Sequence, residues 1–205
     1  MSIKDLEPKY VWNNFYELTR IPRPSKHEHK VQEYLLEWGK KRGFDTKRDE
    51  TGNIIISVPA TPGYENRRGV ILQGHMDMVP QKTSDSHHDF LKDPIDAYID
   101  GEWVTADRTT LGADDGIGVA MSLAALEDPS VEHGPLEVLV TYDEETGMTG
   151  ASELRPGVLK GDILLYLDSE DEGQLFVGCA GGLDTTARYK FTREPLAKGY
   201  RTMAL

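Results

Sequence analysis

Acidic side chains and one histidine recur in this chain directly after apolar runs. Four short stretches hold them: Gly74-His75-Met76-Asp77, Gly112-Ala113-Asp114-Asp115-Gly116, Asp143-Glu144-Glu145-Thr146-Gly147 and Asp168-Ser169-Glu170-Asp171. A fifth stretch, Gly178-Cys179-Ala180-Gly181-Gly182, is rich in glycine. One imidazole with several carboxylates is the ligand set that hydrolytic Zn, Co or Mn centres use. The sequence therefore predicts a metal-dependent hydrolase.

His75 and Asp77 stand two positions apart at the end of an extended run. Side chains two apart on extended backbone point to the same side, so the Asp77 carboxylate can reach a ring nitrogen of His75. That contact fixes the imidazole tautomer and leaves the other nitrogen basic enough to bind a metal. An isolated His-x-Asp pair is more often a simple hydrogen bond at a strand end. The acidic motifs that accompany this pair favour the metal ligand.

The other acids each allow two interpretations. Asp114 and Asp115 lie between glycines before a predicted helix, where one carboxylate could bridge two metals; a helix cap in a glycine-rich turn is the alternative. Glu144 and Glu145 are adjacent and diverge on extended backbone, so one could bind metal while the other faces substrate as a base; a solvated acidic turn is the alternative. Asp168 closes an apolar run, and a carboxylate at the end of a buried strand normally has a partner.

Length and composition restrict the possible classes of protein. The 205 residues suffice for one domain of good size, or for one domain and the opening of a second. A formal charge of −12 argues against nucleic acid and anionic membranes as partners, because a phosphate-binding face needs clustered Lys and Arg. The single Cys179 excludes an internal disulfide, and no apolar run resembles a signal peptide or a membrane span. We therefore expect a cytoplasmic protein.

Apolar periodicity predicts alternating helices and strands. Helical spacing covers Pro8 to Thr19, Ser25 to Gly43 and Ile117 to Glu127. Ser25 and Glu28 form the Ser-x-x-Glu pattern of a capping box. Short apolar runs predict strands at 53–58, 69–73, 136–142 and 163–167, and an Asp-Gly turn predicts a hairpin over 98–105. This alternation is typical of an α/β fold in which ligands collect at strand ends.

The five motifs together resemble the zinc-dependent M20 metallopeptidase family, and within it the N-terminal part of the bacterial aminoacyl-histidine (Xaa-His) dipeptidases. The stretches that carry the resemblance stand in the order of that family: Gly-His-Met-Asp-Met-Val, Leu-Gly-Ala-Asp-Asp-Gly-Ile-Gly, Asp-Glu-Glu-Thr-Gly-Met-Thr-Gly, Leu-Asp-Ser-Glu-Asp-Glu-Gly and Gly-Cys-Ala-Gly-Gly. The resemblance implies a zinc-peptidase-like catalytic domain with a central mixed β-sheet flanked by helices.

The resemblance also implies a domain organisation. Residues 1–185 would be the N-terminal portion of the catalytic domain, and residues 186–205 would begin a lid domain that is otherwise absent. We therefore expect a C-terminally truncated form of a longer protein. A small peptide is the implied substrate, and the complete protein would form a homodimer.

The resemblance assigns the metal ligands residue by residue. His75 and Asp168 would bind one Zn²⁺, Glu145 would bind a second, and Asp114 would be shared by both, with Co²⁺ or Mn²⁺ as alternative metals. The family has one further ligand histidine near its C-terminal end, and no residue of this chain matches it. The resemblance also implies a cis peptide bond between Asp114 and Asp115.

Two residues receive catalytic roles from the resemblance. Asp77 would orient His75, and Glu144 would be the general base that takes a proton from the water bridging the two zinc ions. The predicted reaction is the hydrolysis of Xaa-His dipeptides. Two alternatives remain open: a deacylase or aminoacylase of the M20 family, and a non-catalytic remnant that folds and binds at most one metal.

The remaining histidines and the cysteine are not assigned to the site. His27 and His29 lie on the outer part of a predicted helix, and His87 and His88 lie in a polar run, so we expect all four to face solvent. Cys179 is flanked by small residues, which predicts a tight buried turn with a structural role.

Overall fold

The computed structural model describes residues 2–169, 171, 173–183, 185–192, 195, 197–201 and 203. The chain divides into two units, Met1–Glu170 and Asp171–Leu205. The described residues of the second unit contain no helix or strand, although the rings of Tyr189 and Phe191 stack 6.5 Å apart. The predicted domain boundary at residue 185 falls within this unit and stays a prediction. Residues 193, 194, 196, 202, 204 and 205 of the predicted lid segment lie outside the described residues.

Five strands form a mixed sheet in the first unit, in the order β1-β2-β6-β3-β7. Their bounds are Asp45–Arg48 (β1), Ile54–Val58 (β2), Val70–His75 (β3), Leu136–Thr141 (β6) and Ile163–Tyr166 (β7). Strand β3 runs parallel to both β6 and β7, whereas β2 is antiparallel to β6 and to β1. The carboxyl ends of three parallel strands therefore meet at one edge of the sheet, as the α/β prediction requires.

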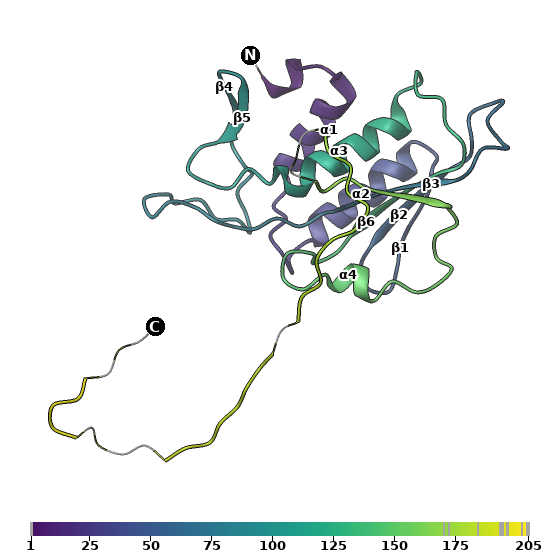
Figure 1. The fold of residues 1–205 in the computed structure, drawn as a ribbon. Coiled ribbons are helices and arrows are strands. Elements are labelled where there is room, and N and C mark those ends of the chain that lie inside the picture. Colours follow the sequence, from purple (N-terminus) through teal and green to yellow (C-terminus); the bar gives the residue numbers. More distant parts are fainter. Residues whose placement is uncertain are drawn as a thin grey trace. The chain divides into compact units, whose positions relative to one another are not determined.

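The remaining elements are short helices and one hairpin (Figure 1). They are η1 (Ile3–Asp5), α1 (Lys9–Thr19), α2 (His29–Lys41), β4 (Ala97–Asp100), β5 (Trp103–Ala106), α3 (Ala113–Glu127) and α4 (Thr149–Ser152). The predicted helices and strands are all present, with some ends shifted by a few residues. The predictions missed β1, because this edge strand has the polar sequence Asp-Thr-Lys-Arg and buries none of its side chains.

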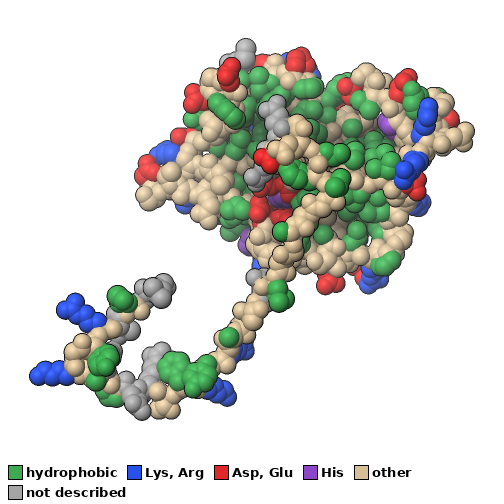
Figure 2. Space-filling model, in the orientation of Figure 1, with side chains coloured by type: hydrophobic (Ala, Val, Ile, Leu, Met, Phe, Trp, Pro, Cys, Tyr) green, Lys and Arg blue, Asp and Glu red, His purple; other side chains and the backbone are tan. Residues whose placement is uncertain are grey.

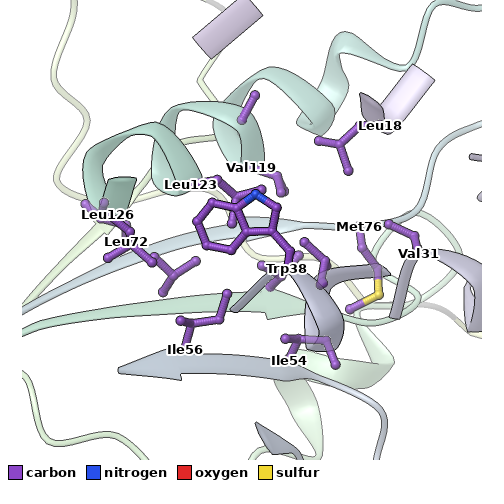
Figure 3. Close-up of a cluster of buried hydrophobic side chains, with 14 of the residues drawn as sticks. Leu18, Val31, Trp38, Ile54, Ile56, Leu72, Met76, Val119, Leu123 and Leu126 are labelled. Atoms are coloured by element: carbon purple, nitrogen blue, oxygen red, sulfur yellow. The ribbon is translucent and has the colours of Figure 1, made fainter. Parts of the chain in front are cut away.

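The main core lies between the helices α1, α2 and α3 and one face of the sheet. Figure 3 shows the Trp38 ring of α2 between Leu123 of α3 and Ile56 of β2. Successive side chains of β2 point to opposite faces of the sheet, since Ile56 belongs to this core and Ile55 packs on the opposite face. The segment that follows α4 covers that second face, where Leu154 packs against a small cluster that includes Ile55.

Two features of the surface complete the description. Cys179 is exposed, so the predicted buried turn is wrong. Among the residues that the structure describes, none belongs to a helix long and apolar enough to cross a membrane.

The packing of α3 leads to a stability prediction. Leu123→Ala removes a side chain that is fully buried between α3 and the sheet. We expect it to lower the free energy of unfolding by about 2–5 kcal/mol, because the cavity cannot fully collapse. Urea denaturation followed by circular dichroism measures this loss. The matched control is Met121→Ala, an exposed position of the same helix, which we expect to change stability by less than about 0.5 kcal/mol. Equal losses from the two variants would contradict the described core.

Candidate metal centre

Three strand ends bring the predicted motifs together. His75 is the last residue of β3, Glu144 and Glu145 follow the end of β6, and Asp168 lies two residues beyond β7. Because β3 is parallel to both neighbours, the three loops leave the sheet at the same edge. Figure 2 shows acidic side chains gathered around a partly visible histidine on one face of the first unit.

His75, Asp114 and Asp168 form a convergent group of ligand atoms. Nε2 of His75 lies 2.8 Å from Oδ1 of Asp114 and 3.8 Å from Oδ2 of Asp168. One atom from each residue lies within 4.8 Å of the others. The His75 side chain is buried, whereas the Asp114 side chain is 56% exposed. The group is therefore packed against the protein at His75 and accessible to solvent at Asp114. One imidazole and two carboxylates with an open side fit the ligand set of a catalytic zinc ion.

Glu145 does not join this group. Within the described part of the chain, two groups of three His, Cys, Asp or Glu residues converge to this degree, and Glu145 belongs to neither. Its carboxyl is nevertheless close enough to Asp114 to be affected by it: burial raises the pKa of Glu145, and the Asp114 charge raises it further. The predicted ligand role of Glu145 stays a prediction.

Asp77 holds His75 and the loop after β6 in place. Its Oδ1 lies 3.3 Å from Nδ1 of His75 and accepts a hydrogen bond of 3.0 Å from the backbone nitrogen of Glu144. Its Oδ2 accepts from the backbone nitrogen of Glu145 (3.2 Å) and from Oγ of Ser25 (2.8 Å). Burial acts to raise the pKa of Asp77, but the hydrogen bonds outweigh it and hold the pKa at about 2. The buried carboxylate is therefore ionised at neutral pH.

The two carboxylates beside His75 also determine its protonation. Burial alone lowers the pKa of an imidazole, but the adjacent carboxylates of Asp77 and Asp114 stabilise the charged form and raise the pKa of His75 to about 9. Without a metal the imidazole therefore carries an extra proton at neutral pH. A metal that binds at Nε2 must displace this proton.

Asp115 is a buried part of the site, and the family resemblance gave its side chain no role. Its Oδ2 accepts a hydrogen bond of 3.1 Å from the backbone nitrogen of His75. A Cβ atom at Gly74 or at Gly118 would overlap the Asp115 carboxylate, so both glycines make room for it. Burial raises the pKa of Asp115 to about 7. The Asp114-Asp115 peptide bond is cis, as the resemblance predicted. The glycines on both sides of the acidic pair, Gly112, Gly116 and Gly118, were the available signal in the sequence.

Arg23 is the second residue that sequence reasoning missed. Its buried guanidinium donates 2.9 Å hydrogen bonds to the carbonyl oxygens of Met76 and Asp77 and a further one to the carbonyl of Gly112. It thus ties the loop after β3 to the start of α3. Burial lowers the pKa of Arg23 to about 10, which leaves the side chain charged at neutral pH.

Comparison with known proteins decides the family. The model of peptidase family M20/M25/M40 matches residues 71–191, more than half of the chain. The chain belongs to this family. The cytosol non-specific dipeptidase of Escherichia coli is 52% identical over 204 residues, which cover 100% of this chain and 42% of that protein.

Solved structures of peptidases share the fold. Aminoacylhistidine dipeptidase from Vibrio alginolyticus has a TM-score of 0.83 at 57% identity, over 84% of this chain and 35% of that one. Aminopeptidase PepT from Bacillus cereus has a TM-score of 0.67 at 26% identity, over 80% of this chain and 44% of that one. The chain thus spans less than half the length of these relatives. The resemblance to the aminoacyl-histidine dipeptidases is confirmed.

Membership of the M20 family and the convergent ligand group together imply a metal cofactor. His75, Asp114 and Asp168 are the residues that fit it best, because they bring one imidazole nitrogen and two carboxylate oxygens to one point. Burial raises the pKa of Glu144; the His75 charge opposes this shift and the Asp168 charge adds to it. The charges of two candidate ligands therefore affect the pKa of Glu144.

The predicted capping box is wrong. Helix α2 begins at His29, and neither Ser25 nor Glu28 caps it through a side chain. Ser25 instead donates to Asp77, and Oε1 of Glu28 accepts hydrogen bonds from the backbone nitrogens of Lys26 (2.9 Å) and Asp143 (3.2 Å). Both polar residues of the motif therefore bond to segments that follow strands β3 and β6, and not to the start of α2.

The other histidines lie outside the ligand group. His27, His29 and His87 are exposed, as expected. His88 is partly buried, with its ring 4.5 Å from that of Phe90, so its predicted solvent exposure is wrong. The apolar partner two residues later explains this burial.

The raised pKa of His75 leads to a prediction about metal binding. Between pH 6 and pH 8 the metal-free imidazole is protonated, since its pKa is about 9. We expect the apparent zinc affinity to rise about tenfold per pH unit over this range, because each binding event releases the His75 proton. Competition with a chelator dye measures the affinity, and calorimetry in two buffers of different ionisation heat counts the proton. An affinity that does not change with pH would contradict the assignment of His75.

Proposed function

We propose that this protein hydrolyses the peptide bond of dipeptides, those of the Xaa-His type among them, with zinc as its metal. The observation that carries the proposal is the convergence of His75, Asp114 and Asp168 at the carboxyl ends of parallel strands, beside Glu144. Two family members that are 52% and 57% identical to this chain over the aligned residues bear dipeptidase names, which supports the substrate class. A cytosolic location is part of the proposal, because the Escherichia coli relative is named a cytosol enzyme.

The proposal assigns the metal ligands as follows. His75 and Asp168 would hold one zinc ion, Glu145 would hold a second, and Asp114 would contact both. When bound, the ions would polarise the scissile carbonyl and make the attacking water more acidic near neutral pH. Asp77 orients His75 through Nδ1, which leaves Nε2 directed at Asp114 and Asp168.

Glu144 would be the general base. Its backbone nitrogen is fixed by Asp77, so the start of its side chain has a defined position at the site. Burial raises its pKa, which brings a carboxyl closer to the range in which it can both accept and return a proton near neutral pH. The residue would take a proton from water and deliver it to the amine that leaves.

Glu144→Ala tests the proposed base. We expect this variant to bind zinc as the parent chain does and to release histidine from an Xaa-His dipeptide about 10²–10⁴-fold more slowly, because proton transfer is lost. The measurement is a histidine-release assay on zinc-loaded protein, with the zinc per chain determined by elemental analysis. Glu102→Ala, an exposed acid on the β4–β5 hairpin, is the control and should leave the rate unchanged.

The zinc count separates the proposal from a non-catalytic alternative. Two zinc ions per chain with turnover that depends on Glu144 would support the proposal. One zinc ion or none, without histidine release, would contradict it for these 205 residues and would favour a form that binds metal without turnover. Release of amino acids from N-acyl substrates in place of dipeptides would identify a deacylase of the same family.

A further inference from the structure

A second group of acids lies behind the metal centre. One carboxylate oxygen each of Glu28, Asp77 and Asp143 lies within 4.8 Å of the other two. The three residues are 1%, 0% and 3% exposed, so water cannot solvate them. Three ionised carboxylates this close together and this deeply buried would repel each other strongly. The protonated His75 beside Asp77 balances one of these charges, whereas Glu28 and Asp143 have no such partner among the described residues.

The hydrogen bonds of the group single out Glu28. Both oxygens of Asp77 and both oxygens of Asp143 accept hydrogen bonds from neighbouring backbone or hydroxyl groups. Oε1 of Glu28 accepts from the backbone nitrogens of Lys26 and Asp143. Oε2 of Glu28 is buried and has no donor among the described residues. Among the carboxylate oxygens of the group, a proton would therefore be most stabilising on Oε2 of Glu28, because this atom has no donor to replace the lost water.

The charges around Glu28 do not favour its ionised form. The groups that face it are Asp77 after β3, and Tyr142 and Asp143 after β6, none of which is a cation. Within the described part of the chain, neither Glu28 nor Asp143 forms an ion pair with Lys, Arg or His. Burial raises the pKa of Glu28 to about 7, and the charges of Asp77 and Asp143 contribute to the rise.

The position of Glu28 connects it to the proposed catalytic loop. Three consecutive backbone nitrogens, those of Asp143, Glu144 and Glu145, donate to buried side-chain carboxyl groups. Glu28 accepts the first hydrogen bond and Asp77 accepts the other two. The direction in which Glu144 and Glu145 leave the backbone is therefore set by both carboxyl groups, and a proton on one of them would remove the repulsion between the two.

We propose that Glu28 is a neutral carboxylic acid that carries its proton on Oε2, and that it is a positioning residue for the loop that carries Glu144 and Glu145. The consequence for turnover rests on the function proposed above, whereas the protonated state does not. A cation held between the three carboxylates is the competing explanation, and the test below distinguishes it.

Glu28→Gln and Glu28→Leu separate these explanations. Glutamine keeps the acceptor and replaces the acidic O–H by an N–H donor, so we expect it to keep the zinc affinity and any histidine release close to those of the parent chain. Leucine keeps the approximate size but has neither the hydrogen-bond acceptor nor the donor. We expect it to lower the zinc affinity about tenfold or more, which is the usual cost of removing a residue that positions a metal ligand. Calorimetry measures the affinity. Glu33→Gln, an exposed acid on α2, is the matched control.

Infrared spectroscopy detects the proton directly. The difference spectrum between the parent chain and Glu28→Gln should contain the carbonyl band of a neutral carboxylic acid at pH 6, and the band should disappear as the pH rises through about 7. This readout does not need catalysis. If the parent chain binds zinc but hydrolyses no dipeptide, the proposed function fails while the band and the zinc affinities still decide the role of Glu28.

Three results would overturn the inference. Absence of the neutral-acid band at pH 6 would show that Glu28 is ionised. A Glu28→Gln variant as impaired as Glu28→Leu would show that the negative charge is required, as a bound cation demands. Undiminished zinc affinity in Glu28→Leu would show that the residue does not position the loop. If the leucine variant does not fold, the band and the glutamine variant still provide the answer.

Discussion

The site depends on one buried carboxylate, that of Asp77. Ionised carboxyl groups are costly to bury unless hydrogen bonds replace the lost water. Asp77 accepts such bonds from Ser25 and from the backbone of Glu144 and Glu145, and it contacts Nδ1 of His75. Its charge therefore holds three separate parts of the chain together.

The strand order explains why these parts can meet. Strand β3 lies between β6 and β7 and is parallel to both, so the residues that follow each strand emerge at one edge. His75 ends the central strand of the three, with Asp168 on one side and the Glu144 loop on the other. Asp114 reaches the same point from the start of α3, where Arg23 fixes the backbone through Gly112. The sheet therefore brings the candidate ligands to one edge, and the buried contacts of Asp77 and Arg23 orient them.

Sequence patterns predicted most of this arrangement because the signals were local. Apolar runs of regular spacing located the strands and the main helices, whereas the family resemblance named His75, Asp114 and Asp168, which the structure brings together. The prediction failed where a residue acts over a long distance in the chain. Glu28 looked like a helix cap, but it bonds to the backbone of Asp143, which is 115 positions away. No local pattern distinguishes these two uses of a glutamate.

The most direct test of the account is the zinc affinity of Asp77→Asn, measured by calorimetry on protein shown to be folded by circular dichroism. The substitution keeps the size of the side chain and removes the charge that orients His75 and holds the Glu144 backbone. The account predicts an affinity about 10–100-fold lower than that of the parent chain. An unchanged affinity in a folded Asp77→Asn variant would contradict the central role of this carboxylate.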